Sequence, residues 1–175
     1  MDLEALAQIS AAGLAGVFTG AAAFMTLAQH PALLEMHRAE FQAPYFRRMY
    51  FYAARMQAPM AIGSGLSSMT VYLLQRGRDC GCQNRGGMPR IWLLSGTIMM
   101  AIVPYTMTRM LALNRRLTDT KRYKTYGRDW LQLMLKRWGE LHDVRTGASL
   151  IAFTGMLVAL ACSSQPAAHM PAHVH

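Results

Sequence analysis

Apolar residues along this chain gather into four stretches that are long enough to form membrane-spanning helices. Lys, Arg, Asp and Glu are absent from four intervals, which are Glu4 to Glu35, Arg55 to Arg76, Arg90 to Arg109, and everything after Arg145. Each stretch reaches or approaches the roughly 17–25 apolar residues that cross the hydrocarbon core of a bilayer. The pattern predicts an all-α fold, a four-helix transmembrane bundle. We assign residues 1–162 to this membrane domain and residues 163–175, which are small, polar and contain proline, to a disordered tail.

Prolines and changes in polarity set the expected helix boundaries. Pro31 ends the first helix, because the residue before a proline avoids helical geometry. The segment Pro31–Tyr52 mixes charges with aromatic rings, which predicts a partly helical connection at the membrane interface. Pro104 is expected to kink the third helix, and the fourth helix is long, with an amphipathic first half and an apolar second half. The expected helices cover Ala5–Gln29, Met56–Leu74, Ile91–Leu117 and Asp129–Ala161.

Small residues mark one face of the first helix. Gly16 and Gly20 lie four positions apart, a spacing that lets membrane helices approach each other closely. The favoured interpretation is packing within one bundle, and the alternative is the seam of a homo-oligomer.

The composition agrees with a multi-pass integral membrane protein. The chain is 53% hydrophobic and only 15% charged, against roughly 25% charged residues in a typical soluble domain. Asp2 and Glu4 occupy the place where a signal peptide carries basic residues, so we interpret the first stretch as a retained helix.

The net charge of +9 does not indicate a nucleic-acid-binding protein. The basic residues lie in loops between apolar stretches rather than on a soluble domain with aromatic stacking platforms. Most of them fall in two segments, 31–55 and 115–145, which four spans would place on the same side of the membrane. The positive-inside rule makes that side cytoplasmic, so both termini are predicted to face away from the cytoplasm.

The three cysteines do not form a disulfide framework. Cys80 and Cys82 are close together in a loop rich in Gly and Arg, and a membrane thiol oxidoreductase is one interpretation. Such enzymes use the CxxC spacing, whereas this pair is CxC. An incidental or structural pair is therefore the favoured interpretation.

A polar cluster stands at the start of the last apolar stretch. Trp138, His142 and Arg145 are offset by four and three residues, so they share one face of a helix. A short connection makes the third and fourth helices antiparallel neighbours, which brings Asn114 to a similar depth. Ionisable residues are costly within a membrane and usually serve a function there. The alternative is a buried network that only locks the bundle together.

The motifs resemble those of a known family. These motifs are the Gly-rich first helix that ends near Pro31, the segment 108–117 with Asn114 and then Leu117, and the segment from Trp138 through His142 to Arg145. In this arrangement the chain resembles, over nearly its whole length, the anthrone oxygenases and their bacterial relatives, which are small four-span membrane proteins.

The resemblance implies a monooxygenase that oxidises an anthrone, a hydrophobic planar polyketide taken from the lipid phase, to the anthraquinone. It implies dioxygen as the oxidant, with no flavin or nicotinamide. An imidazole suits removal of the acidic methylene proton, so His142 is the expected base. Arg145 would stabilise the oxyanion, Asn114 would bind a carbonyl or phenol, and Trp138 would stack on the substrate. Tyr105 and Arg109 are further substrate-binding candidates.

Several of these residues have alternative interpretations. Trp138 can be an interfacial anchor, and Arg109 can reach the headgroups or pair with Asp143. His30 and His142 together would be able to ligate iron or haem, which no other feature requires. The tail residues His169, Met170, His173 and His175 lack a supporting shell, so we expect no metal site there. A noncatalytic four-helix subunit is the alternative function.

Overall fold

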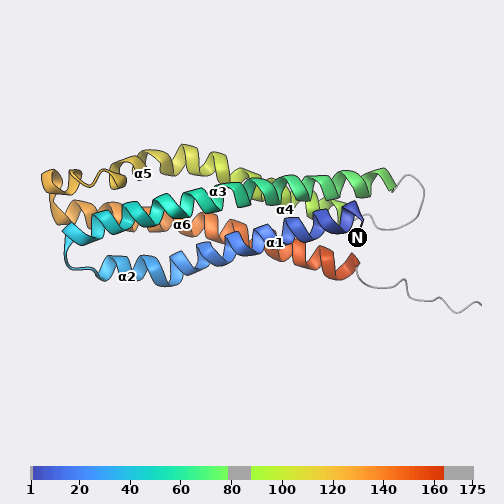
Figure 1. The fold of residues 1–175 in the computed structure, drawn as a ribbon, viewed down its shortest axis with the longest axis horizontal. Helices are drawn as coiled ribbons and strands as arrows, with labels where there is room; N and C mark the ends of the chain where they lie inside the picture. The colour runs from blue at the N-terminus through green and yellow to red at the C-terminus, as the bar shows by residue number, and fades with distance from the viewer. Residues whose placement is uncertain (1, 79–87, 164–175) are drawn as a thin grey trace, which may run out of the picture.

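A computed structural model of the protein describes residues 2–78 and 88–163, and the helices in these ranges form four long rods that lie side by side (Figure 1). The described part of the chain contains helices and no strand, which confirms the all-α prediction. The beginning of the first rod and the end of the last lie at the same end of the bundle. The first rod consists of α1 (Leu3–Phe24), the π-helical turn η1 (Met25–Gln29) and α2 (His30–Glu35), and the second is α3 (Ala39–Arg78). The third rod consists of α4 (Met88–Tyr105), the π-helical turn η2 (Thr106–Met110) and α5 (Leu111–Thr118), and the fourth is α6 (Arg122–Ser163).

Three of the four rods are long and apolar enough to cross a membrane. They are Leu3–Glu35, Met88–Thr118 and Arg122–Ser163. The chain thus has the features of a membrane protein. The Cys80 and Cys82 pair and the tail histidines lie outside the described residues, and so does all of the predicted tail except Ser163, which ends α6.

The prediction that Pro31 ends the first helix is wrong, because the rod stays helical through Glu35. The π-helical turn η1 precedes Pro31, and the proline then occupies the first turn of α2. Proline is tolerated in a first turn because its missing N–H group would have no partner there.

The predicted start of the second helix at Met56 is wrong, since α3 runs without interruption from Ala39 to Arg78 with two prolines inside it. The connection predicted for Pro31–Tyr52 is therefore mostly helical, and its location at the membrane interface stays a prediction. Ala43, Phe46 and Met49 are all buried, and their spacing of three places them on one helical face. Packing of this face against the neighbouring rods stabilises helical geometry where the charges and prolines argued against it.

Pro104 disturbs the third rod at the predicted place, but the result is the π-helical turn η2 rather than a simple kink. Two threonine hydroxyls bond to backbone carbonyls here: Thr106 Oγ1 donates to Ile102 O and Thr108 Oγ1 donates to Pro104 O, both at 2.8 Å. Such bonds satisfy carbonyls near a proline, which itself has no N–H group to donate.

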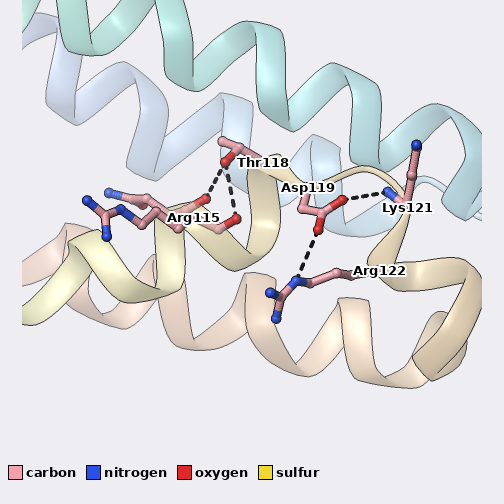
Figure 2. Close-up of polar contacts among 6 residues, drawn as sticks. Arg115, Thr118, Asp119, Lys121 and Arg122 are labelled. Carbon is pink, nitrogen blue, oxygen red and sulfur yellow. Dashed lines mark hydrogen bonds and ion pairs between the residues drawn. The ribbon is translucent and has the colours of Figure 1, made fainter.

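The turn between α5 and α6 is held by Asp119 (Figure 2). Its carboxylate accepts hydrogen bonds from the backbone N–H of Lys121 and from Arg122 Nε, both at 3.2 Å. These two hydrogen bonds hold the pKa of Asp119 below its usual value, since they favour the charged carboxylate. Gly127 then breaks the helical path of α6 with a φ of 84°, a conformation that favours glycine. Regular helix from near Asp129 therefore agrees with the sequence.

Two hydrophobic clusters fill the bundle. One includes Phe18, Trp92 and Met156, and lies among α1, α3, α4 and α6. The other includes Phe46 and Trp138, and extends toward α2 and α5. Each rod therefore contributes to two separate cores along its length. A site can form where these two cores meet.

Small residues bring α3 and α4 into close contact. A side-chain carbon placed on Gly96 would lie 2.9 Å from Ser68 Cβ and 3.1 Å from the carbonyl oxygen of Gly65. Ser68 Oγ also donates a 2.7 Å hydrogen bond to Trp92 O. On the first helix, Gly16 packs against Phe153 of the same chain, so this face contributes to packing within the bundle.

We expect Gly96→Ala to destabilise the bundle by about 1–3 kcal/mol, because the added methyl group forces α3 and α4 apart. Gly13→Ala is the matched control, since nothing lies within 4 Å of the added carbon. The measurement is reversible unfolding in detergent. Equal stability of Gly96→Ala and the unmodified protein would show that the two helices do not pack this closely.

Candidate functional site

A cavity of about 190 Å³ lies where the two hydrophobic clusters meet. All four rods contribute to its wall, which is mostly apolar. Both π-helical turns line it, η1 through Met25 and η2 through Thr106 and Met107. Single π-helical turns occur frequently at functional sites. The polar side chains in the wall are Tyr50, Gln57, Thr106, Trp138, His142 and Arg145.

The predicted face of α6 borders this cavity. Trp138, His142 and Arg145 all line it. The rings of Trp138 and His142 are stacked, with centroids 4.7 Å apart and planes 11° apart. The edge of Phe46 contacts Trp138 from α3, at a centroid distance of 5.3 Å. The indole is therefore held in place on two sides and is 2% exposed.

Asn114 of α5 fixes the same indole. Trp138 Nε1 donates a 2.9 Å hydrogen bond to Asn114 Oδ1. Asn114 is buried, and its Nδ2 atom has no partner among the described residues. Because Asn114 is not among the residues that line the cavity, its contact with the site passes through Trp138.

The backbone of α1 fixes the proton position on His142. His142 Nε2 lies 3.3 Å from Ala22 O. A carbonyl oxygen only accepts hydrogen bonds, so Nε2 carries the hydrogen. The other ring nitrogen, Nδ1, is buried and has no partner among the described residues. In a neutral ring this nitrogen would hold the free electron pair.

Arg145 brings a positive charge to the cavity wall from the same face of α6. Its guanidinium donates a hydrogen bond to Gln57 Oε1 of α3 and lies over the ring of Phe18 of α1, 5.3 Å from the centroid. Arg145 Nε is buried without a partner among the described residues. A cation held in this way, with an unused donor, can attract an oxygen atom that develops negative charge.

His30 lies near the cluster but not in the cavity wall. Its Nε2 atom is 2.9 Å from Leu135 O, and its ring is 5.7 Å from that of Trp138. The ring packs directly on Gly139, where an added side-chain carbon would overlap the imidazole of His30. The described residues contain no group of three or more His, Cys, Asp or Glu side chains that would hold a metal ion. Iron or haem ligation by His30 and His142 remains a prediction.

The two weaker substrate-binding candidates lie outside the wall. Tyr105 is half-buried, and its hydroxyl donates a 3.2 Å hydrogen bond to Leu141 O of α6. Arg109 is exposed, and neither residue is among those that line the cavity. Asp143, considered as a partner for Arg109, accepts a hydrogen bond from Thr26 Oγ1 at 3.1 Å.

Sequence reasoning missed Gln57 and Phe18, the two side chains that hold Arg145. Gln57 had a detectable signal, because it is an amide two residues inside the charge-free stretch that follows Arg55. Phe18 had none, since one aromatic residue in an apolar helix predicts only burial. Its role depends on how α1 packs beside α6.

The site combines three chemical capacities in one small apolar space. His142 Nδ1 can accept a proton, Arg145 can stabilise an anion, and Trp138 offers part of an aromatic wall. The low polarity of the space strengthens electrostatic contacts. Such a set suits a flat, apolar molecule that loses a proton and forms an oxyanion.

Comparison with known families gives one match. The family model described as "Anthrone oxygenase" matches residues 46–155, which is more than half of the chain. The matched range includes Gln57, Asn114, Trp138, His142 and Arg145. No curated protein and no solved structure matches the chain.

We predict that Asn114 and Trp138 are energetically coupled. Asn114→Leu leaves the indole N–H without an acceptor, while Trp138→Phe removes the donor, so the double variant should lose less stability than the sum of the two single variants. A coupling of about 0.6–1.7 kcal/mol is expected for a hydrogen bond between membrane helices. Unfolding of the four proteins in detergent measures it.

The control cycle pairs Asn114→Leu with Ser163→Ala, since Ser163 ends α6 at the far end of the bundle. These two changes should be additive. Additive effects for Asn114 and Trp138 as well would mean that the hydrogen bond contributes nothing to stability.

Proposed function

Because the chain belongs to the anthrone oxygenase family, we propose that it is a membrane-embedded monooxygenase that oxidises an anthrone-like aromatic polyketide to the anthraquinone with dioxygen. Family membership indicates an oxygenase-related function. The more specific proposal depends on one observation: His142, whose Nδ1 atom has no partner among the described residues, and Arg145 line the same apolar cavity.

The first step in this proposal is loss of a proton from the methylene group of the anthrone. His142 Nδ1 takes the proton, since Nε2 already donates to Ala22 O. The charge that remains moves onto the carbonyl oxygen of the substrate, which becomes phenolate-like. Arg145 stabilises this oxygen through a charge-assisted hydrogen bond.

The second step transfers electrons to dioxygen. The electron-rich anion gives one electron to dioxygen, and the substrate radical and superoxide combine into a peroxide anion at the former methylene carbon. The protonated His142 returns its proton to this anion, which becomes a hydroperoxide. Loss of water then forms the second carbonyl group. The carbon loses two hydrogens and gains one oxygen atom, while the other oxygen atom of dioxygen leaves as water with both hydrogens, so no other reductant or oxidant is required.

The wall residues orient the substrate in this scheme. Trp138 and Phe18 offer aromatic surfaces to a planar ring system. Asn114 acts as a positioning residue, because it holds the indole and does not line the cavity. We expect no cofactor beyond dioxygen, with an iron or haem enzyme that uses His30 and His142 as the alternative.

In the proposed arrangement all four rods cross the bilayer. The α3 rod packs along α1 and α4, and it has no charged residue between Arg55 and Arg76. With four crossings, the basic segments 31–55 and 115–145 lie on the cytoplasmic side and both termini on the other.

We predict that His142→Ala reduces the turnover of a simple anthrone in air by about 10²–10⁴-fold, the usual contribution of a general base. Arg145→Lys should cost about 10²–10³-fold, because a compact ammonium group replaces the guanidinium at the oxyanion. Both variants should keep their membrane level and helix content. His37→Ala is the control, since His37 is exposed and lies outside the cavity wall.

The assay is run with and without a chelator and records quinone formation and oxygen uptake. Turnover that persists with chelator supports the cofactor-free scheme, while chelator-sensitive turnover favours His30 and His142 as ligands. If the native protein has no turnover and both variants lose stability, the cluster is structural and the noncatalytic function holds instead.

A further inference from the structure

A second hollow opens beside the cavity, between the first rod and α3. It has a volume of about 370 Å³, and we call it the α1–α3 groove. None of its lining residues carries a charge. They are Ala21, Phe24, Met25 and Gln29 from the first rod, and Met49, Tyr52, Ala53, Met56 and Gln57 from α3.

The groove and the cavity share three lining residues, namely Met25, Ala53 and Gln57. These residues therefore form a partition between the two spaces. The polar contact across it is weak: Gln57 Nε2 lies 3.7 Å from Met25 Sδ, and a thioether is a poor acceptor. A methionine side chain has three rotatable bonds and changes shape readily. Ala53 adds only a methyl group, so the partition is thin.

The outer side of the groove faces away from the bundle. Phe24 is 63% exposed and Tyr52 is 70% exposed, and both lie on rods that run along the length of the bundle (Figure 1). Tyr52 is close to the end of the basic segment 31–55, so this part of the groove lies at the cytoplasmic interface of the bilayer, where aromatic side chains contact lipid. An apolar molecule dissolved in the bilayer can therefore reach the groove without entering water.

The cavity alone is small for the proposed substrate. Its volume of about 190 Å³ lies below the roughly 300–1,000 Å³ of typical ligand sites. Displacement of the partition would join it to the groove. A planar substrate would then be bound partly between α1 and α3, with its reacting end near His142.

The other hollow next to the cavity has a different character. It has a volume of about 890 Å³ and is lined by Arg47, Arg48, Thr118 and Thr120, together with Pro44 and three aromatic residues. One of these, Tyr52, also lines the α1–α3 groove. This hollow shares only Tyr50 with the cavity. Two exposed arginines favour an anionic or hydrated ligand over a neutral apolar one, so this space is a poor entrance for an anthrone.

We propose that the planar apolar substrate enters sideways from the bilayer through the α1–α3 groove, and that Met25, Ala53 and Gln57 form the gate to the cavity. This inference rests on the proposed function for the identity of the substrate. Gln57 contacts two residues: its Nε2 atom lies near Met25 Sδ, and its Oε1 atom accepts the hydrogen bond from Arg145. Opening of the gate therefore leaves the guanidinium free to bind the substrate oxygen.

The test is an Ala21→Phe variant in proteoliposomes, because Ala21 lines the groove but not the cavity. The added ring should lower kcat/KM for a simple anthrone by about tenfold or more, since it must be displaced on entry. The kcat at saturating substrate should change little. Ala21→Leu, a smaller intrusion, should give a smaller change in the same direction if Ala21→Phe folds poorly.

A second readout does not require turnover. Anthraquinone, the product, should quench the fluorescence of Trp138 in the cavity wall. The part of the quenching that is absent in Trp138→Phe is the part that comes from Trp138. Stopped-flow mixing of anthraquinone-loaded vesicles then gives the association rate. We expect Ala21→Phe to slow association by the same factor as kcat/KM.

Two controls separate the routes. Ala101→Phe adds the same ring at an exposed site on α4 that lines none of these hollows, and it should change neither rate. Thr120→Phe obstructs the basic hollow and should also have no effect. The proposed route would be overturned if Ala21→Phe kept the association rate and kcat/KM of the unmodified protein. It would also be overturned if Thr120→Phe were the one variant that lowers them. If the native protein binds anthraquinone but oxidises no anthrone, the proposed function fails while the association rates still decide the route.

Discussion

The half-buried guanidinium of Arg145 is the constraint on which the rest of the site depends. A guanidinium inside a bundle needs an acceptor and a favourable surface, since an unpaired buried charge is very costly. Gln57 of α3 supplies the acceptor, and the ring of Phe18 of α1 supplies the surface. One side chain on α6 thus fixes its own rod against two others. The cavity that Arg145 lines has residues of both hydrophobic clusters in its wall.

His142 uses one of its two ring nitrogens in a contact within the bundle. Its ring stacks on Trp138 and bonds to the backbone of α1, and Trp138 in turn bonds to Asn114. Each of these contacts uses one polar atom. His142 Nδ1 and Arg145 Nε, whose residues line the cavity, and Asn114 Nδ2, whose residue does not, are left without partners among the described residues. A purely structural network would be expected to use these atoms as well. Two unused polar atoms beside an apolar cavity are more consistent with a ligand site, which is why we favour catalysis.

Much of this arrangement could be predicted from the sequence, because it depends on local spacing. The charge-free intervals revealed the long helices, and the offsets of four and three placed Trp138, His142 and Arg145 on one face. Pro31 and the segment after it were misjudged for a physical reason: buried residues such as Phe46 keep α3 helical across positions where prolines and charges favour an end. The role of Phe18 depends on a contact between distant segments, which a single sequence does not reveal.

The tautomer of the His142 ring is the property that tests the proposed chemistry most directly. Nitrogen NMR of the protein with ¹⁵N-labelled histidine, assigned by comparison with His142→Gln, reports which ring nitrogen carries a hydrogen. The proposed scheme predicts a neutral ring protonated at Nε2, with a bare Nδ1 whose signal shifts when anthraquinone binds. A ring protonated at Nδ1 in the resting protein, with a signal that anthraquinone leaves unchanged, would contradict the assignment of His142 as the base.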